Sequence, residues 1–225
     1  VLSWAFRSEG IAIAARLSSA LWRFWHMRGH LNEGRRWFDR VLHATRSTAL
    51  PLPLRAKVLE AAGVLAWAQA DSVKAVSLLE GALAIWRELG DQAGIAAVLN
   101  NLGRVARETY DYTRARTCHE ESLALRRALG DKLGVAASLS NLGLIALDQG
   151  DYERGIALYE ESLLLTRELG VKSEIANNLN TLGSAVAIHR GDYVHATVLL
   201  EESLAVSREL AAMAITDHHH MICNE

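Results

Sequence analysis

The chain has 225 residues, a formal net charge of -2, a hydrophobic fraction of 50%, two prolines and two cysteines. This composition is typical of a helical protein with abundant core material. Two cysteines give no disulfide framework, so we expect a reducing compartment, the cytoplasm. The sequence contains no run of eighteen apolar residues and predicts no membrane span.

The charge is unevenly distributed along the chain. Residues 1–58 carry ten Arg and Lys against three acids, and the remainder carries fourteen against twenty-three. All six Trp lie at or before Trp86, and all five Tyr lie at or after Tyr110. We therefore expect the N-terminal part to be a variant segment. Because the sequence starts at Val1 without a signal-peptide pattern, we interpret it as a piece of a longer protein.

In chain order, apolar residues at intervals of three and four predict five helix pairs, at about 10–46, 55–89, 93–129, 133–169 and 173–210. The first pair carries Trp22 where later pairs carry glycine, so we expect it to pack differently. The organisation predicted is a variant pair over 1–50, four regular pairs over 54–210, and a tail or the start of a further helix over 211–225. One extra residue before Gly191 predicts a bulge or a slipped turn in the last pair.

The later pairs repeat with a period of 40 residues. Asn-Leu-Gly at 101–103 returns at 141–143 and, as Thr-Leu-Gly, at 181–183; Glu-Ser-Leu at 121–123 returns at 161–163 and 202–204. A fixed period of this size indicates a solenoid whose units stack on their neighbours. A mid-helix glycine costs about 1 kcal/mol relative to alanine. Small residues kept in register therefore predict close helix packing at Gly63, Gly103, Gly143 and Gly183, and at Ala75, Ala115, Gly155 and Ala196.

These positions resemble the tetratricopeptide repeat. The matching residues are Leu139, Leu142-Gly143 and Ala146 in a first helix, Gly150-Asp151-Tyr152 at the turn, and Gly155, Tyr159 and Ser162-Leu163 in a second helix. The 40-residue period is similar to that of kinesin light chain-like arrays. The resemblance implies an all-α fold, a right-handed α-solenoid (superhelix) of antiparallel helix pairs, and a role in binding proteins or peptides.

A second resemblance concerns the variant segment. Leu21–Trp25, Gly29-His30-Leu31 and Glu33–Trp37 are similar to the sensor arrays of bacterial multidomain signal-transduction ATPases and helix-turn-helix transcriptional regulators. In those proteins a nucleotide-binding module precedes the array. This sequence has no Gly-x4-Gly-Lys-Ser/Thr loop, so no ATP site of that type is carried over.

Several residues of types that act in catalysis or metal binding have simpler, structural interpretations. Cys118 and His119 fall at core positions of the repeat, and the paired glutamates at 120–121, 160–161 and 201–202 are expected on a solvated face. His218-His219-His220 with Cys223 is expected to be a frayed tail, because adjacent histidines do not readily reach one tetrahedral ion; whether it binds metal stays open. We therefore expect no catalytic activity, no cofactor and no metal site.

The tetratricopeptide resemblance implies a groove lined by the first helix of each pair. Its positions fall on Arg16, Arg23, Lys57, Glu60, Asn100, Arg104, Arg107, Ser140, Asn177, Asn180 and Ser184, with Ser19 and His26 beside them if the variant pair keeps the register. Asparagine donates to and accepts from a peptide backbone at once. The Arg-rich N-terminal end is expected to favour acidic segments.

The leading interpretation is a protein- or peptide-binding module of a larger bacterial regulatory protein. The alternatives are a sensor groove for a small signalling ligand and an oligomerisation scaffold that self-associates through its terminal helices. Exposed apolar patches on those helices would favour the scaffold. We expect this region to contact neither nucleic acid nor membrane directly.

Overall fold

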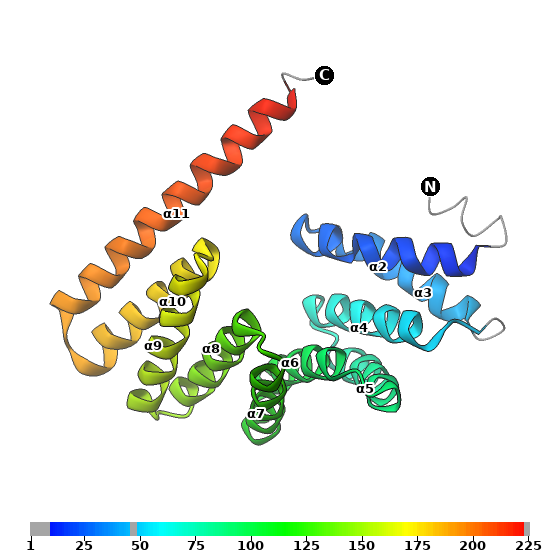
Figure 1. The fold of residues 1–225 in the computed structure, drawn as a ribbon, viewed down its shortest axis with the longest axis horizontal. Coiled ribbons are helices and arrows are strands. Elements are labelled where there is room, and N and C mark those ends of the chain that lie inside the picture. The colour runs from blue at the N-terminus through cyan, green and yellow to red at the C-terminus, as the bar shows by residue number, and fades with distance from the viewer. Residues whose placement is uncertain (1–9, 46–48, 223–225) are drawn as a thin grey trace. The chain divides into compact units, whose positions relative to one another are not determined.

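The computed structural model describes residues 10–45 and 49–222, with side chains up to Met213. Every regular element in these ranges is a helix, so the predicted all-α class is confirmed (Figure 1). Backbone contacts divide the chain into two compact units, one ending at Leu125 and the other beginning at Arg126. No helix in the described ranges is sufficiently long and apolar to span a bilayer.

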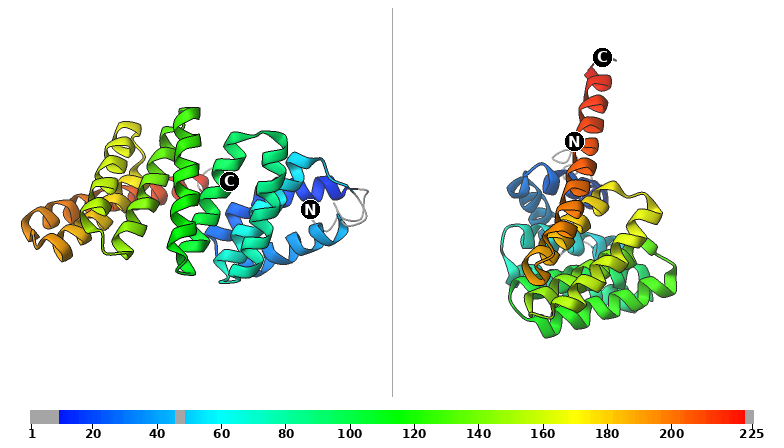
Figure 2. Two further views of the ribbon diagram at one scale, coloured as in Figure 1. Left: turned by 90° about the horizontal axis from the view of Figure 1, so that it is seen from below. Right: turned by 90° about the vertical axis from the view of Figure 1, so that its left-hand side faces the viewer.

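The first unit consists of helix pairs that pack in chain order. It contains α2 (Ile11–Met27), α3 (Leu31–Ala44), α4 (Leu52–Ala68), α5 (Ser72–Leu89), α6 (Gln92–Glu108) and most of α7 (Tyr112–Leu129). The pairs are α2/α3, α4/α5 and α6/α7, seen as adjacent helices in Figure 2. The first helices of adjacent pairs also contact each other, α2 with α4 and α4 with α6. This arrangement is that of an α-solenoid of antiparallel helix pairs, as predicted.

The second unit continues the same architecture. It contains α8 (Lys132–Asp148), α9 (Tyr152–Leu169), α10 (Lys172–Ala185), the π-helical turn η1 (Val186–Arg190) and α11 (Tyr193–Ile222). The π turn lies where the sequence has its extra residue, which confirms the predicted bulge. α11 runs unbroken to Ile222, so the segment after residue 210 extends this helix. The side chains of the His218–His220 tail and Cys223 lie outside the described residues.

Glycine and aspartate set the ends of the regular helices. Gly90 and Gly130 close α5 and α7 in the left-handed region, with φ of 68° and 70°. Such φ values suit glycine because it lacks a Cβ. Asp91 and Asp131 then begin α6 and α8, and their carboxylates accept hydrogen bonds from the backbone N–H groups of residues 94 and 134, both at 2.9 Å. The Leu-Gly-Asp motif therefore ends one helix and starts the next.

Mid-helix glycines mark where the two helices of a pair come closest. A Cβ added to these glycines would lie within 3 Å of one side chain of the paired helix, in the combinations Gly63 with Leu79, Gly103 with His119, Gly143 with Tyr159, and Gly183 with Leu200. The predicted close packing is thus confirmed in all four pairs. His119 is fully buried and Cys118 nearly so, as expected from their place in the repeat.

The variant pair packs around aromatic rings instead of a glycine. Trp25 and Phe38 are buried and meet edge to face, with ring centroids 6.0 Å apart. On α3, Gly34 lies against Trp25 and against Leu65 of the next pair. Trp22, at the position of the missing glycine, remains only half-buried and faces a pocket. The pair therefore stacks on α4/α5 by a contact of its own.

Exposed ion pairs connect successive second helices at the repeat period. They join Arg87 to Glu121 at 3.0 Å, Arg127 to Glu161 at 3.1 Å, and Arg167 to Glu202 at 2.6 Å. The second glutamate of each pair is solvated, as expected, and also has a defined partner. Exposed pairs of this kind are worth at most about 1 kcal/mol each.

Candidate functional site

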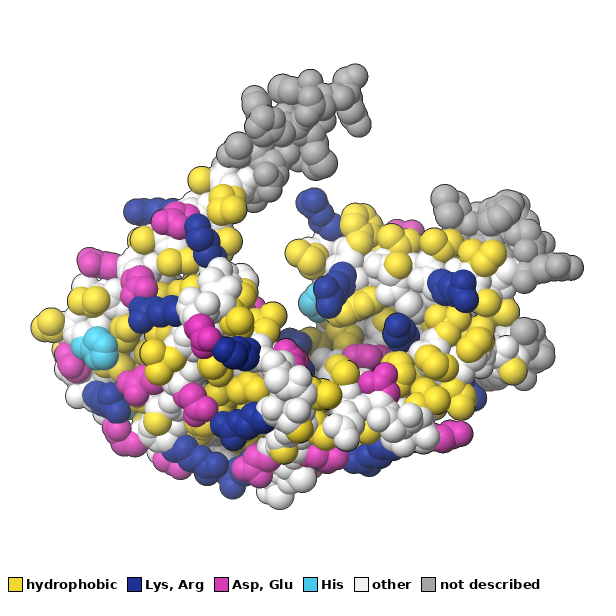
Figure 3. All heavy atoms as spheres, in the orientation of Figure 1, with side chains coloured by type: hydrophobic (Ala, Val, Ile, Leu, Met, Phe, Trp, Pro, Cys, Tyr) yellow, Lys and Arg dark blue, Asp and Glu magenta, His cyan; other side chains and the backbone are white. Residues whose placement is uncertain are grey.

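Two adjacent pockets lie between α2 and α4, and they contain the first predicted groove residues. The larger, of about 470 Å³, is lined by Arg16, Ser19, Ala20, Pro51, Pro53, Leu54 and Lys57. The smaller, of about 210 Å³, is lined by Ser19, Trp22, Arg23, Lys57, Glu60, Ala61 and Val64. Ser19 and Lys57 line both, so we treat them as one site, the α2/α4 site. Several Lys and Arg side chains are visible over these helices in Figure 3.

The helices position these side chains by their periodicity. Arg16, Ser19 and Arg23 are spaced by three and four residues on α2, as are Lys57, Glu60 and Val64 on α4. Residues at such spacings share one face of a helix. The three cations are exposed or at the rim, whereas Pro51, Pro53 and Leu54 form an apolar wall. The site combines positive charge with apolar surface.

Glu60 is the unusual group of the α2/α4 site. It is half-buried, and Asn101 of α6 donates a hydrogen bond from Nδ2 to its Oε1 at 3.3 Å. The Trp86 indole N–H approaches the carboxyl but falls short of standard hydrogen-bond geometry. Burial raises the pKa of Glu60 to about 7, against weaker opposing effects of Trp86 and Lys57. Near neutral pH this carboxyl therefore changes its charge.

Ser19 adds a hydroxyl with unused hydrogen-bonding capacity. Its Oγ is shielded from solvent and has no partner among the residues that the structure describes. Ser19 also lines both pockets. Trp22 presents its ring to the smaller pocket, where the Arg23 guanidinium lies 5.5 Å from the ring centroid.

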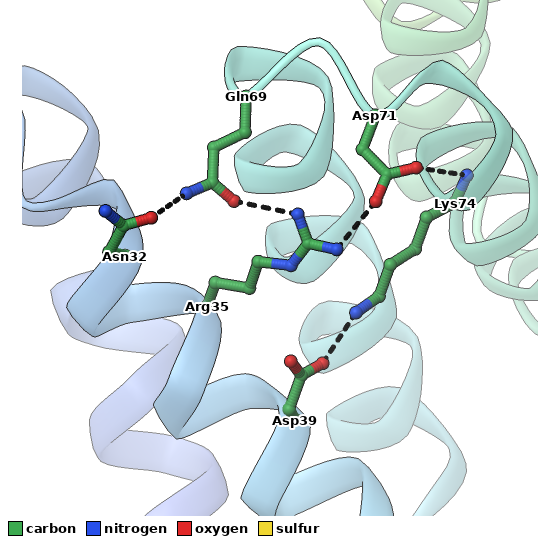
Figure 4. Close-up of polar contacts among 6 residues, drawn as sticks. All are labelled: Asn32, Arg35, Asp39, Gln69, Asp71 and Lys74. Carbon is green, nitrogen blue, oxygen red and sulfur yellow. Dashed lines mark hydrogen bonds and ion pairs between the residues drawn. The ribbon is translucent and has the colours of Figure 1, made fainter.

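A polar network positions α2/α3 against α4/α5 and so holds the site together. It comprises Asn32, Arg35, Asp39, Gln69, Asp71 and Lys74 (Figure 4). Arg35 donates to Gln69 at 3.1 Å and to Asp71 at 2.6 Å. The hydrogen bond from Arg35 keeps the pKa of Asp71 below its usual value. Arg35, in the Glu33–Trp37 segment of the variant pair, thus contributes a fixed contact to the next pair.

The predicted groove residues of α6 do not line the α2/α4 site. Arg104 stacks on the face of Trp67, with its Cζ 4.0 Å from the ring centroid. Trp67 donates from Nε1 to Glu108 Oε2 at 2.6 Å. Arg104 is therefore held by a cation–π contact between α4 and α6. Asn100 and Arg107 are half-buried, and each has further interactions within the chain.

In the second unit the predicted residues separate into two groups. The Ser140 hydroxyl lies 2.8 Å from that of Ser162 and donates to Asn178 Oδ1 at 2.9 Å, so it bridges α8, α9 and α10. Asn177 and Asn180 are exposed and line a pocket of about 330 Å³, together with Ala176, Leu200, Ser203, Leu204 and Ser207. Ser184 donates to the Asn180 carbonyl at 2.8 Å.

The sequence indicated the charged rim of the α2/α4 site but not its walls. Neither the apolar wall of Pro51, Pro53 and Leu54 nor Trp67 was singled out from the sequence. The signal that could have found Trp67 is its spacing of seven residues from Glu60 on one helix face. In the described part of the chain, no cluster of His, Cys, Asp and Glu could hold a metal ion.

Part of the chain is similar in sequence to a curated transcriptional regulator. An HTH-type transcriptional regulator of Mycobacterium tuberculosis is 32% identical over 107 residues, which are 45% of this chain and 12% of that protein. The chain thus matches only about an eighth of the length of this relative.

Solved structures with low sequence identity share the fold. A kinesin light chain with nearly identical TPR-like repeats from Podospora anserina has a TM-score of 0.69 at 19% identity, covering 88% of this chain and 98% of that one. A Rap protein complexed with competence and sporulation factor has a TM-score of 0.78 at 12% identity, and the match covers 87% of this chain and 54% of that one. A STAND protein with a tetratricopeptide repeat sensor from Pyrococcus horikoshii has a TM-score of 0.67 at 15% identity, and the match covers 89% of this chain and 30% of that one.

The family model extends over most of the repeats. The model described as tetratricopeptide repeat matches residues 54–128 and 134–209, which is more than half of the chain. The matched ranges contain the glycines that pack against their paired helices and the Glu-Ser-Leu motifs. The chain therefore belongs to the tetratricopeptide repeat family.

Proposed function

We propose that this chain is a non-catalytic binding module that takes a protein or peptide segment in the α2/α4 site. The observation that carries the proposal is the pair of adjoining pockets with Arg16, Arg23 and Lys57 around them. Cations beside an apolar wall suit a segment that alternates carboxylates with apolar side chains. Ser19, whose hydroxyl has no partner among the described residues, lines both pockets between these cations.

The module is further proposed to serve a larger bacterial regulatory protein. The support is the HTH-type relative, of which the match covers 12%, together with the fold shared with a STAND protein sensor and with a Rap protein bound to a signalling factor. We expect the purified chain to release no phosphate from ATP. Turnover that a single substitution within the chain abolishes would contradict the non-catalytic role.

A labelled acidic peptide tests the binding site. The probe is a fluorescein-labelled octapeptide of alternating Glu and Leu, with an alternating Lys and Leu octapeptide as the charge control. Lys57→Glu should weaken binding of the acidic probe about tenfold or more, as measured by fluorescence anisotropy, because a charged hydrogen bond is worth about 1.5–3 kcal/mol. Arg55→Glu is the matched control, since Arg55 is an exposed cation on the same helix outside both pockets.

The two variants distinguish a local contact from the overall charge. If both weaken binding equally, the attraction depends on net charge and the α2/α4 site is not the binding surface. If the Lys and Leu octapeptide binds as tightly as the acidic probe, the preference for acidic segments is wrong.

Self-association is a second candidate function, favoured by the exposed face of α10 and α11. Leu204 is 50% exposed and Leu200 37%, whereas their counterparts in the preceding repeat, Leu163 and Tyr159, are each 5% exposed. We propose that a second copy of the chain covers this face. Light scattering across a concentration series should show dimers that Leu204→Glu abolishes. A monomer at all concentrations would exclude this candidate.

A further inference from the structure

The α2/α4 site contains an acid where an acidic partner is expected to bind. Glu60 lines the same 210 Å³ pocket as Arg23 and Lys57. A second carboxylate in so small a space meets Glu60 at close range, and two carboxylates sharing a site cannot both remain charged. The cations at the rim attract the incoming carboxylate, so the proton is held on the more buried partner, Glu60.

We propose that Glu60 is a proton-linked specificity residue, which takes up one proton when a carboxylate of the partner enters the pocket. This inference rests on the proposed function and adds its regulation. With Glu60 neutral, the pocket presents Arg23, Lys57 and a carboxylic acid that donates a hydrogen bond. With Glu60 ionised, the same pocket repels the carboxylate. Partner binding therefore weakens as the pH rises through neutrality.

The surroundings of Glu60 allow both protonation states. On its own helix it faces Lys57, on α2 Arg23, on α5 the neutral Trp86 indole, and on α6 the neutral Asn101 amide. Asn101 already donates to Oε1, and the buried Trp86 N–H has no hydrogen-bond partner of its own. Both donors are available to the ionised form, so the empty site can release the proton near neutral pH.

Two other basic side chains, Arg104 and His26, lie near this pocket. Arg104 of α6 is stacked on Trp67. His26 of α2 meets the ring of Trp22 edge to face, with centroids 6.2 Å apart. A pH dependence of anion binding can in general also come from an imidazole side chain. The test must therefore separate Glu60 from His26.

The size of the effect follows from linkage. With a pKa of about 7 in the empty site, roughly nine-tenths of Glu60 is ionised at pH 8 and one-tenth at pH 6. The Kd of the Glu and Leu octapeptide should therefore rise about tenfold from pH 6 to pH 8. The glutamates of the probe itself remain ionised throughout this range, because their pKa lies near 4.3.

Anisotropy titrations at pH 6, 7 and 8 with four proteins test the proposal. Glu60→Gln should bind with the pH 6 affinity of the wild type at every pH. His26→Gln should keep the wild-type dependence, as should Glu88→Gln, which replaces an exposed acid on α5. Calorimetry at pH 7.5 in two buffers of different ionisation enthalpy should detect about three-quarters of a proton taken up by the wild type and none by Glu60→Gln.

The outcomes separate this inference from the proposed function. A probe that binds at every pH with unchanged Kd overturns the proton-linked role and leaves the binding site standing. Dependence on pH that persists in Glu60→Gln and disappears in His26→Gln assigns the effect to His26 and overturns the inference. A probe that does not bind at any pH overturns the proposed function and this inference with it. Circular dichroism confirms that each variant is folded.

Discussion

At the scale of single residues, burial decides the behaviour of Glu60. Burial raises the pKa of Glu60 in the folded protein to about 7, from its ordinary value of 4.5. Below pH 4.5 Glu60 is protonated in both the folded and the unfolded state and does not reduce the free energy of unfolding. Between pH 4.5 and pH 7 the unfolded chain has released the proton that the folded state retains, so the free energy of unfolding falls as the pH rises. Above pH 7 the penalty is on the order of 3 kcal/mol.

Glu60→Gln should therefore gain stability over the wild type as the pH rises. Urea denaturation at pH 5 and pH 8 measures the difference between the two proteins, in which the other titrating groups cancel. We expect a small difference at pH 5 and a gain for the variant on the order of 2–3 kcal/mol at pH 8. An equal difference at both pH values would show that the carboxyl titrates normally.

Replacement by alanine should have opposite effects on stability at two glycines, Gly103 and Gly81. At Gly103 a new Cβ would lie 2.5 Å from Nε2 of the buried His119, whereas at Gly81 it would meet only Leu59, at 3.5 Å. Gly103→Ala should destabilise by about 1–3 kcal/mol through overpacking. Gly81→Ala should stabilise by about 0.5–1 kcal/mol through helix propensity. Thermal unfolding showing the same sign for both would contradict the assigned packing register.

At the scale of helices, the Glu-Ser-Leu motif connects the two members of a pair. Ser122 donates from Oγ to the Ala96 carbonyl at 2.8 Å, and Ser162 donates to the Ala136 carbonyl at 2.9 Å. The third copy repeats this bond from α11 to α10. The serine joins second to first helix, whereas the preceding glutamate pairs with an arginine of the previous repeat.

Ser122→Ala should accordingly lower the free energy of unfolding more than Glu121→Gln does. The buried hydroxyl bond is worth about 0.5–1.5 kcal/mol, and its loss also leaves the Ala96 carbonyl without that donor. The exposed pair of Glu121 with Arg87 is worth less, and its contribution should fall with added salt. Chemical denaturation at low and high salt measures both. A larger loss for Glu121→Gln than for Ser122→Ala at high salt would reverse this ranking.

At the scale of the whole molecule, the repeat made the architecture predictable. The 40-residue period fixed which residues share a register, and each predicted glycine contact is present. The order of helix pairs followed from the same pattern. Regular repeats favour such prediction because each unit contacts mainly its neighbours. The extra residue before Gly191 likewise indicated the π turn η1.

The site was less predictable, for physical reasons. Arg16, Arg23, Lys57 and Glu60 were found because helical spacing places them on one face. The burial of Glu60 depends on side chains of three other helices, which no local pattern encodes. The use of Ser140 as an internal bridge depends on Asn178, where the previous repeat has a serine. Register alone does not distinguish a free polar residue from one already bonded.

Hydrogen–deuterium exchange with the Glu and Leu octapeptide tests the central claim most directly, because it reports which helices the probe contacts. At pH 6 the account predicts slower exchange in α2 and in the first half of α4, around Ser19 and Lys57, with no change in α10 and α11. Lys57→Glu should remove this protection and Arg55→Glu should retain it. Protection confined to α10 and α11, or spread evenly over the second helices, would contradict the assignment of the α2/α4 site as the binding surface.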